Sequence, residues 1–326
     1  MPLVEVSNLK TWYPVRGGLF SPRRHVKAVD GVSFTVEHGE TVGLVGESGC
    51  GKSTLGRTLI CLETHTDGTY KIDNVEISSL KGGELRRRRR DFQMIFQDPY
   101  GSLNPRMTIY SMLDEVLHLY NKWNKEKRHD RIIELIEMVG LRSECVNRYP
   151  HQFSGGQRQR IGIARALAVE PKLIIADEPV SALDVSVQAQ IINLLENIQK
   201  KTGVAFLFIA HDLAVVEHIS DRILVMYLGK IVESGSASEI CGNPSHPYTK
   251  ALLSAIPTVD PETRRKRIIL PGDVPSPLDP PKGCPFHPRC PMAVEKCKNN
   301  APALEPVSNS DKHISACFFS EKTKDM

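Results

Sequence analysis

The sequence predicts an α/β fold with an inserted helical subdomain and a C-terminal extension rich in proline and cysteine. Apolar runs at 41–45, 173–176 and 204–210 have the length and composition of buried strands. Between about 98 and 168 the apolar residues follow the three-to-four spacing of helices, and prolines and cysteines become frequent after 235. We therefore expect a core domain at 1–235, with its helical subdomain at about 98–168, and an extension at 236–326.

The first hundred residues favour strands around a glycine-rich loop. The stretches LVEVSNLKTWYPV and AVDGVSFTVEHGE have strand-like patterns, and the run at 41–45 leads into GESGCGKST. Such a loop folds its backbone N–H groups around a phosphate; Lys52 would reach the outer phosphates and Ser53 would ligate Mg²⁺. The predicted ATP contacts here are Gly46, Ser48, Gly49, Cys50, Gly51, Lys52, Ser53 and Thr54. The alternative is a glycine-rich turn with a chance lysine.

A helical region follows, and then a strand that carries two carboxylates. Residues 113–119 and 131–139 have helical periodicity, and Gly140 is a plausible helix stop. The sequence LIIADEP at 173–179 indicates a buried parallel strand with Asp177 and Glu178 at its end. Asp177 would hold Mg²⁺, and Glu178 would act as the catalytic base that activates water. Two carboxylates that cap a helix are the competing interpretation.

The sequence FSGGQ at 153–157 carries a family resemblance. Ser154, Gly155, Gly156 and Gln157 resemble the signature motif of ATP-binding-cassette (ABC) transporter ATPases, with Phe153 in place of the usual leucine. Ser154 can cap the following helix, and the glycines allow a close approach to a phosphate. The resemblance implies a head-to-tail dimer in which this loop meets the ATP of the opposite subunit. A flexible serine-glycine loop is the alternative.

Four further positions match the same family. Gln97 resembles the glutamine that senses Mg²⁺ and water, and His211 resembles the histidine that contacts the terminal phosphate. The resemblance thus implies that Gln97 and His211 act in catalysis together with Glu178, and that Gln97 is also a Mg²⁺ ligand. Asp184 lies in the segment that crosses the dimer interface, and Tyr13 resembles the residue that stacks on adenine, although Trp12 could do so instead. In isolation, such a histidine or glutamine is usually only a satisfied polar residue.

The extension narrows the resemblance. The sequences NPSHPYTKALLSAIP and GCPFHPRCPMA are similar to the C-terminal region of oligopeptide, dipeptide and nickel importer ATPases, and most of all to the second ATPase of the peptide permeases. This resemblance implies peptide import, with a second cassette ATPase, two transmembrane permease subunits and an extracytoplasmic solute-binding protein as partners, at the cytoplasmic face of the cell membrane. The ATPase pair could also be a homodimer. A nickel or other small-solute importer, or a cassette ATPase outside transport, are the alternatives.

The last 45 residues hold four cysteines, Cys284, Cys290, Cys297 and Cys317. Four thiolates can ligate an iron–sulfur cluster, and some members of the family group carry a 4Fe-4S cluster at such cysteines. Zinc is the rival, although its structural sites more often use closely spaced cysteine pairs. Disulfides fit poorly with a cytoplasmic ATPase, and free thiols are the remaining alternative.

Composition is that of an ordinary globular protein, with a net charge of +4 over 326 residues. That charge gives no reason to expect a nucleic acid partner. No apolar run approaches the roughly 20 residues that span a bilayer, so any membrane role is expected to depend on partner chains. The basic run Arg86–Arg90 is interpreted as a solvated face, with contact to anionic lipid as a weaker hypothesis.

Overall fold

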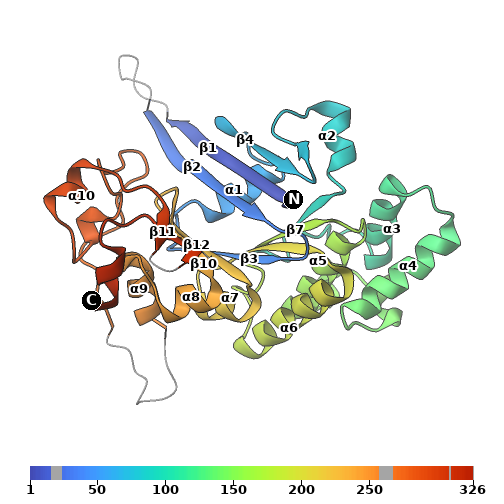
Figure 1. Cartoon of the computed structure of the whole chain (residues 1–326). Coiled ribbons are helices and arrows are strands. Elements are labelled where there is room, and N and C mark those ends of the chain that lie inside the picture. The colour runs from blue at the N-terminus through green and yellow to red at the C-terminus, as the bar shows by residue number, and fades with distance from the viewer. Residues whose placement is uncertain (16–23, 257–266, 308–309, 326) are drawn as a thin grey trace. The chain divides into compact units, whose positions relative to one another are not determined.

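The computed structural model describes residues 1–15, 24–256, 267–307 and 310–325 (Figure 1). The chain divides into two compact units. The first unit contains Met1, residues 36–40 and residues 79–208. The second contains residues 2–35, 41–78 and the described residues from 209 onward. The α/β class predicted from the sequence is confirmed, since both units combine strands with helices.

The first unit is built on three neighbouring strands of a sheet, in the order β8-β7-β6, and β6 pairs with β7 in parallel. Its strands are β6 (Phe92–Ile95), β7 (Leu173–Asp177) and β8 (Ala205–Ile209), and Phe92 pairs with Leu173. Every residue of β7 and β8 is buried, as expected for strands that are covered on both faces. The end of β7 therefore delivers Asp177 and the following Glu178 from a rigid support.

Helices occupy the segment for which the sequence predicts a helical subdomain. They are α3 (Ile109–Tyr120), α4 (Lys125–Met138) and α5 (Gly155–Leu167), which contact one another, with the short η1 (Ser143–Asn147) and η2 (Pro150–Gln152) between α4 and α5. The side chain of Asn124 caps α4, and Gly140 follows its end with a φ of 72°, which confirms the predicted helix stop. The remaining helices of this unit are α2 (Gly82–Arg88) and α6 (Val185–Thr202).

The second unit contains a four-stranded antiparallel sheet. Its strands are β1 (Val4–Val15), β2 (Arg24–Val36), β4 (Asp67–Ile72) and β5 (Val75–Glu76), in the order β2-β1-β4-β5. Val4 pairs with Ile72 across β1 and β4. This sheet carries Trp12 and Tyr13 near the end of β1.

A further run of neighbouring strands in the same unit joins the phosphate-loop region to the C-terminal part of the chain, in the order β11-β12-β10-β9-β3. Its strands are β3 (Thr41–Val45), β9 (Arg222–Tyr227), β10 (Lys230–Ser236), β11 (Glu305–Val307) and β12 (Ser310–Ser315). The accompanying helices are α1 (Lys52–Leu59), α7 (Leu213–Ile219), α8 (Ala237–Gly242), α9 (Pro247–Ser254), η4 (His287–Arg289), α10 (Glu295–Asn299) and η5 (Ser320–Asp325).

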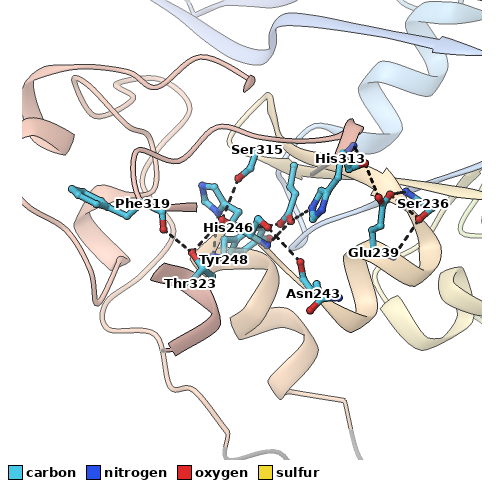
Figure 2. Close-up of polar contacts among 12 residues, drawn as sticks. Ser236, Glu239, Asn243, His246, Tyr248, His313, Ser315, Phe319 and Thr323 are labelled. Atoms are coloured by element: carbon cyan, nitrogen blue, oxygen red, sulfur yellow. Dashed lines mark hydrogen bonds and ion pairs between the residues drawn. The ribbon is translucent and has the colours of Figure 1, made fainter. Parts of the chain in front are cut away.

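Buried polar contacts hold β12 against β10 (Figure 2). His313 Nε2 lies 2.7 Å from Oε1 of Glu233, a fully buried carboxylate that also accepts from the backbone N–H groups of Ser245 and His246 at 2.6 and 3.0 Å. Ser310 donates to Glu239 at 2.8 Å. Residues 310–315 are thus paired with β10 in the second unit, and the domain boundary at 235 stays a prediction.

Candidate functional site

Glycines shape the loop between β3 and α1 because neighbouring backbone leaves no room for side chains. Gly46 and Gly51 have φ values of 155° and 109°, in the region that favours glycine. A Cβ atom would overlap the carbonyl oxygen of Met226 at Gly46 and that of Ala28 at Gly51. The close packing supports the interpretation of this loop as a phosphate cradle rather than an ordinary turn.

Lys52 is held inside this loop. Its side chain is buried, and Nζ donates to the carbonyl oxygens of Gly46 at 2.7 Å and Glu47 at 3.1 Å. Cys50, two residues earlier, is also buried, and burial raises the pKa of its thiol, which agrees with a small packed residue. The ammonium group is therefore placed where the loop backbone turns.

The two aromatic candidates for adenine stacking have different surroundings on β1. Burial raises the pKa of the Tyr13 hydroxyl, and a hydrogen bond with the side chain of Thr54 in α1 partly offsets this increase. The Trp12 indole N–H donates to Asp30 at 3.2 Å, and the Lys27 ammonium lies 4.9 Å from the centre of the Trp12 ring. Tyr13 is thus the aromatic residue beside the helix that follows the phosphate loop.

The first unit brings together Gln97 and Glu178, which the sequence suggested from separate motifs. Gln97 Nε2 donates to Oε2 of Glu178 at 2.9 Å and to Oγ of Ser181 at 3.4 Å. The Ser181 hydroxyl donates back to the carbonyl oxygen of Glu178 at 3.1 Å. Glu178 has a φ of 46°, an uncommon value for a residue with a side chain, and it directly follows the buried Asp177.

The signature loop starts α5 with a reciprocal capping box. The Ser154 hydroxyl accepts from the Gln157 N–H at 3.4 Å, and the Gln157 side chain accepts from the Ser154 N–H at 3.0 Å. A Cβ atom at Gly156 would lie 2.5 Å from a methyl group of Val187, just beyond Asp184 at the start of α6. The signature loop and the predicted interface segment therefore lie together.

His211 and the basic run are both at the surface. His211 is exposed and directly precedes Asp212, whose side chain caps α7 by accepting from the Ala214 N–H at 2.9 Å. The basic run Arg86–Arg90 includes the end of α2, a helix with no buried residue. The exposure of α2 agrees with the interpretation of this run as a solvated face.

The sequence interpretation missed two residues that contact the phosphate loop. Arg289 forms a bidentate ion pair with Glu47, at 2.6 and 3.1 Å, and the Tyr248 hydroxyl accepts from the Glu47 N–H at 2.7 Å. Glu47 stands within the recognised loop motif, but its partners lie more than 200 residues further along the chain. No local pattern could have assigned them.

The four C-terminal cysteines line one pocket, together with apolar side chains that include Phe286 and Phe319. None of the chain's cysteines forms a disulfide. Burial raises the pKa of Cys284, and it raises those of Cys290 and Cys317 to about 11, with smaller increases from neighbouring thiolates. Among the residues that the structure describes, no three His, Cys, Asp or Glu side chains are arranged to hold a metal ion.

Comparison with known proteins gives the same family over both parts of the chain. A family description of the ABC transporter matches residues 29–181, and one of the oligopeptide/dipeptide transporter C-terminal region matches residues 232–297. The chain is 52% identical over 319 residues to the dipeptide transport ATP-binding protein DppF of Haemophilus influenzae, covering 97% of this chain and 96% of that protein. It is 51% identical to the oligopeptide transport ATP-binding protein AppF of Bacillus subtilis, covering 97% of each.

A solved structure supports the cassette fold. The ATP-binding cassette MJ0796, in a dimeric post-hydrolysis state bound to ADP and Pi, matches with a TM-score of 0.63 and 31% identity. The match covers 72% of this chain and 98% of that one. Within the described ranges, none of the helices combines the length and apolar character needed to cross a membrane.

Proposed function

The chain belongs to the ATP-binding subunits of the oligopeptide/dipeptide ABC importers, and we propose that the residues described above form its ATP-hydrolysing site. It couples ATP hydrolysis to the uptake of dipeptides or oligopeptides. The observation that carries the assignment of individual residues is the hydrogen bond between Gln97 and Glu178. It links a glutamine suited to sensing Mg²⁺ with the carboxylate suited to activating water.

ATP would be bound through its phosphates. The backbone N–H groups of the loop from Gly46 to Thr54 form the cradle, and Lys52 places its charge against the outer phosphates. Ser53, Gln97 and Asp177 would hold Mg²⁺, because hydroxyl, amide and carboxylate oxygens are its usual ligands. When bound, Mg²⁺ supplies charge neutralisation for the phosphates. Tyr13 would stack on the adenine, with support from its position beside Thr54.

Hydrolysis needs a base for the attacking water and a steady terminal phosphate. Glu178 would accept the proton of that water, while Gln97 holds one of its carboxylate oxygens and thereby orients the other. His211 would hydrogen-bond the terminal phosphate. Positioning and charge stabilisation then supply most of the rate acceleration, as in other phosphoryl transfers.

A partner ATPase would complete the site. ABC ATPases work as dimers, and the signature loop begins α5 at the exposed Gly155, where a helix N-terminus favours a phosphate. We place Ser154, Gly155, Gly156 and Gln157 of each subunit against the ATP of the other, with Asp184 at the interface. The partner is expected to be a second, similar cassette ATPase, with a homodimer as the alternative.

The dimer would act beneath two transmembrane permease subunits, at the cytoplasmic face of the membrane, supplied by an extracytoplasmic solute-binding protein. Uptake by the complex reconstituted in liposomes, with labelled dipeptide, labelled oligopeptide and Ni²⁺ as solutes, tests this function. ATP-dependent uptake of either peptide class supports it. Uptake of Ni²⁺ but of neither peptide would instead identify the complex as a nickel importer.

We further propose that Cys284, Cys290, Cys297 and Cys317 hold a 4Fe-4S cluster. Support comes from the shared pocket and its donors, which are four thiols and two imidazoles with no carboxylate. Because no three of these donors are arranged to hold a metal ion in the described structure, cluster binding would have to draw the thiols together. The raised pKa values of Cys284, Cys290 and Cys317 mean that these three thiols keep their protons until a bound metal displaces them. The cluster would stabilise a segment with little core of its own. Zinc at the same residues is the rival proposal.

A further inference from the structure

Glu47, in the middle of the phosphate loop, is bound at two points by the C-terminal part of the chain. Arg289 Nη1 and Nη2 donate to its two carboxylate oxygens at 2.6 and 3.1 Å, a fork-to-fork geometry. The backbone N–H of Glu47 donates to the Tyr248 hydroxyl at 2.7 Å. Both partners lie outside the loop and the strands that support it.

These two partners are themselves firmly held. The Arg289 side chain is 9% exposed and stands in η4, one residue before Cys290. Tyr248 is fully buried in α9, with its ring centre 4.7 Å from that of Tyr227 and 5.4 Å from that of Phe286. A rigid arginine fork and a packed phenol can fix a loop, because little freedom remains for them to lose.

Through Glu47, these contacts extend to Lys52, the proposed phosphate-binding lysine. The carbonyl oxygen of Glu47 accepts from Lys52 Nζ at 3.1 Å, so Glu47 is held by its side chain, its N–H and its carbonyl oxygen at once. The Glu47 carboxylate is 28% exposed and belongs to a loop that must receive a polyanion. Without Arg289 its negative charge would repel phosphate at short range.

We propose that Arg289 and Tyr248 are positioning residues that hold the phosphate loop in its ATP-binding conformation, Arg289 also neutralising Glu47, so that the C-terminal region sets the affinity for ATP. This inference rests on the proposed ATP site. The conformation of a phosphate loop determines where its N–H groups point, and a loop fixed in advance loses less entropy on binding. The C-terminal region would thus take part in ATP binding by fixing the phosphate loop.

The test is the equilibrium affinity of the full-length chain for MgATP, measured by calorimetry beside the thermal unfolding of each nucleotide-free variant. Arg289→Met should weaken binding by about tenfold or more, because it releases the loop and leaves the Glu47 charge uncompensated. Glu47→Gln combined with Arg289→Met should recover part of that loss, since the repelling charge is gone. Arg289→Lys should fall between, because an ammonium keeps the charge without the fork.

Three further variants make the result decisive. Lys298→Met breaks the exposed pair with Glu295 in the same region and should leave the affinity unchanged. Tyr248→Phe removes one hydroxyl from an intact ring cluster, so it should fold and still bind ATP several-fold more weakly. Lys52→Ala should abolish binding; if it does not, the proposed ATP site itself is wrong.

The inference is overturned if Lys52→Ala abolishes binding while folded Arg289→Met and Tyr248→Phe both bind MgATP as tightly as the wild type. In that case Arg289 only fastens the C-terminal region. Should Arg289→Met fail to fold, the MgATP affinity of Tyr248→Phe decides alone. A weakened affinity supports the proposal, and an unchanged affinity contradicts it. A double variant that binds no better than Arg289→Met contradicts the neutralising role of the arginine.

Discussion

Gln97 Nε2 donates to Oε2 of Glu178 over 2.9 Å, across 81 positions of sequence. The contact fixes one oxygen of the proposed catalytic base and makes its orientation depend on a residue in the loop that follows β6. Glu178 also has a positive φ, so its backbone as well as its side chain is set by the surrounding structure. Such constraint is common where a side chain must meet a reacting group.

Glu178→Gln should reduce ATP turnover by about 100-fold or more, because the amide cannot accept the proton of the attacking water. Binding of MgATP should persist, since the amide oxygen can still accept from Gln97. Steady-state hydrolysis and nucleotide binding in the reconstituted complex measure the two effects separately. Glu196→Gln, which removes a carboxylate paired with Lys200 on α6, is the matched control and should hydrolyse ATP normally. Near-normal turnover in Glu178→Gln would remove this residue from the role of base.

Ser154→Asp separates capping of α5 from contact with the partner's ATP. Aspartate caps helices as well as serine does, so the fold should be retained. Its negative charge would face the phosphates of the opposite subunit and should lower ATP hydrolysis by about tenfold or more. Analytical ultracentrifugation of the chain with its partner ATPase should show loss of the ATP-dependent dimer.

Asn124→Asp makes a comparable change at the cap of α4 and serves as its control. Both variants should bind MgATP as the wild type does. If Ser154→Asp dimerises and hydrolyses ATP normally, the signature loop does not meet a phosphate in the proposed way.

Replacing Cys290 by serine should remove the proposed cluster. Anaerobically purified wild-type protein should be coloured, with broad absorbance around 400 nm from thiolate-ligated iron, and the variant should lose both colour and iron. Cys145→Ser, at a cysteine outside the pocket, should keep both. Colourless wild-type protein that contains stoichiometric zinc would establish the rival metal.

His313→Ala should destabilise the second unit. It leaves the fully buried Glu233 carboxylate without its side-chain partner, and loss of a buried hydrogen-bond partner typically costs about 1–3 kcal/mol, or more for a charged group. Urea unfolding should show this loss, and proteolysis should release the last residues of the chain first, because the contact joins β12 to β10 (Figure 2). Glu295→Gln, at an exposed pair, should change stability by less than about 1 kcal/mol. Equal effects would show that burial of the Glu233–His313 pair is unimportant.

Glu239 should contribute to acid sensitivity. Hydrogen bonds from the Ser236 backbone and side chain, and from Ser310, lower the pKa of its carboxyl in the folded protein. Since the folded pKa lies below the unfolded value of about 4.3, this contribution is present above that value and is lost as pH falls through the folded pKa. The stability difference between wild type and Glu239→Gln should be roughly 1 kcal/mol near neutral pH and should shrink below about pH 4.3.

Denaturant titrations at a series of pH values test this sign. Glu217→Gln, at an exposed position on α7, should not change the slope of stability against pH. A difference for Glu239→Gln that grows on acidification would contradict the assigned direction.

The elements that the sequence predicted depend on short-range signals. The phosphate loop, the capped start of α5 at Ser154 and the end of α4 before Gly140 are all encoded within a few residues, through backbone freedom or side-chain caps. The strand at 173–177 was predictable because the wholly apolar run at 173–176 has the length and composition of a buried strand.

Other features depend on contacts between distant residues. Glu233 on β10 pairs with Ser315 on β12, and Arg289 forms an ion pair with Glu47. Each contact joins segments that share no local sequence pattern. Spacing grouped the four cysteines, but only the folded chain places them around one pocket. The family resemblance alone favoured Tyr13 over Trp12, whereas the position of Tyr13 beside Thr54 required the folded chain.

The most direct measurement is mass spectrometry of the proteins that co-purify, in mild detergent with MgATP, with a tagged Glu178→Gln chain taken from native membranes. Because this variant should bind ATP without hydrolysing it, the proposed dimer should stay assembled. The account predicts recovery of a second cassette ATPase, two permease subunits and a solute-binding protein. Recovery of the tagged chain without permeases or any second ATPase would contradict it.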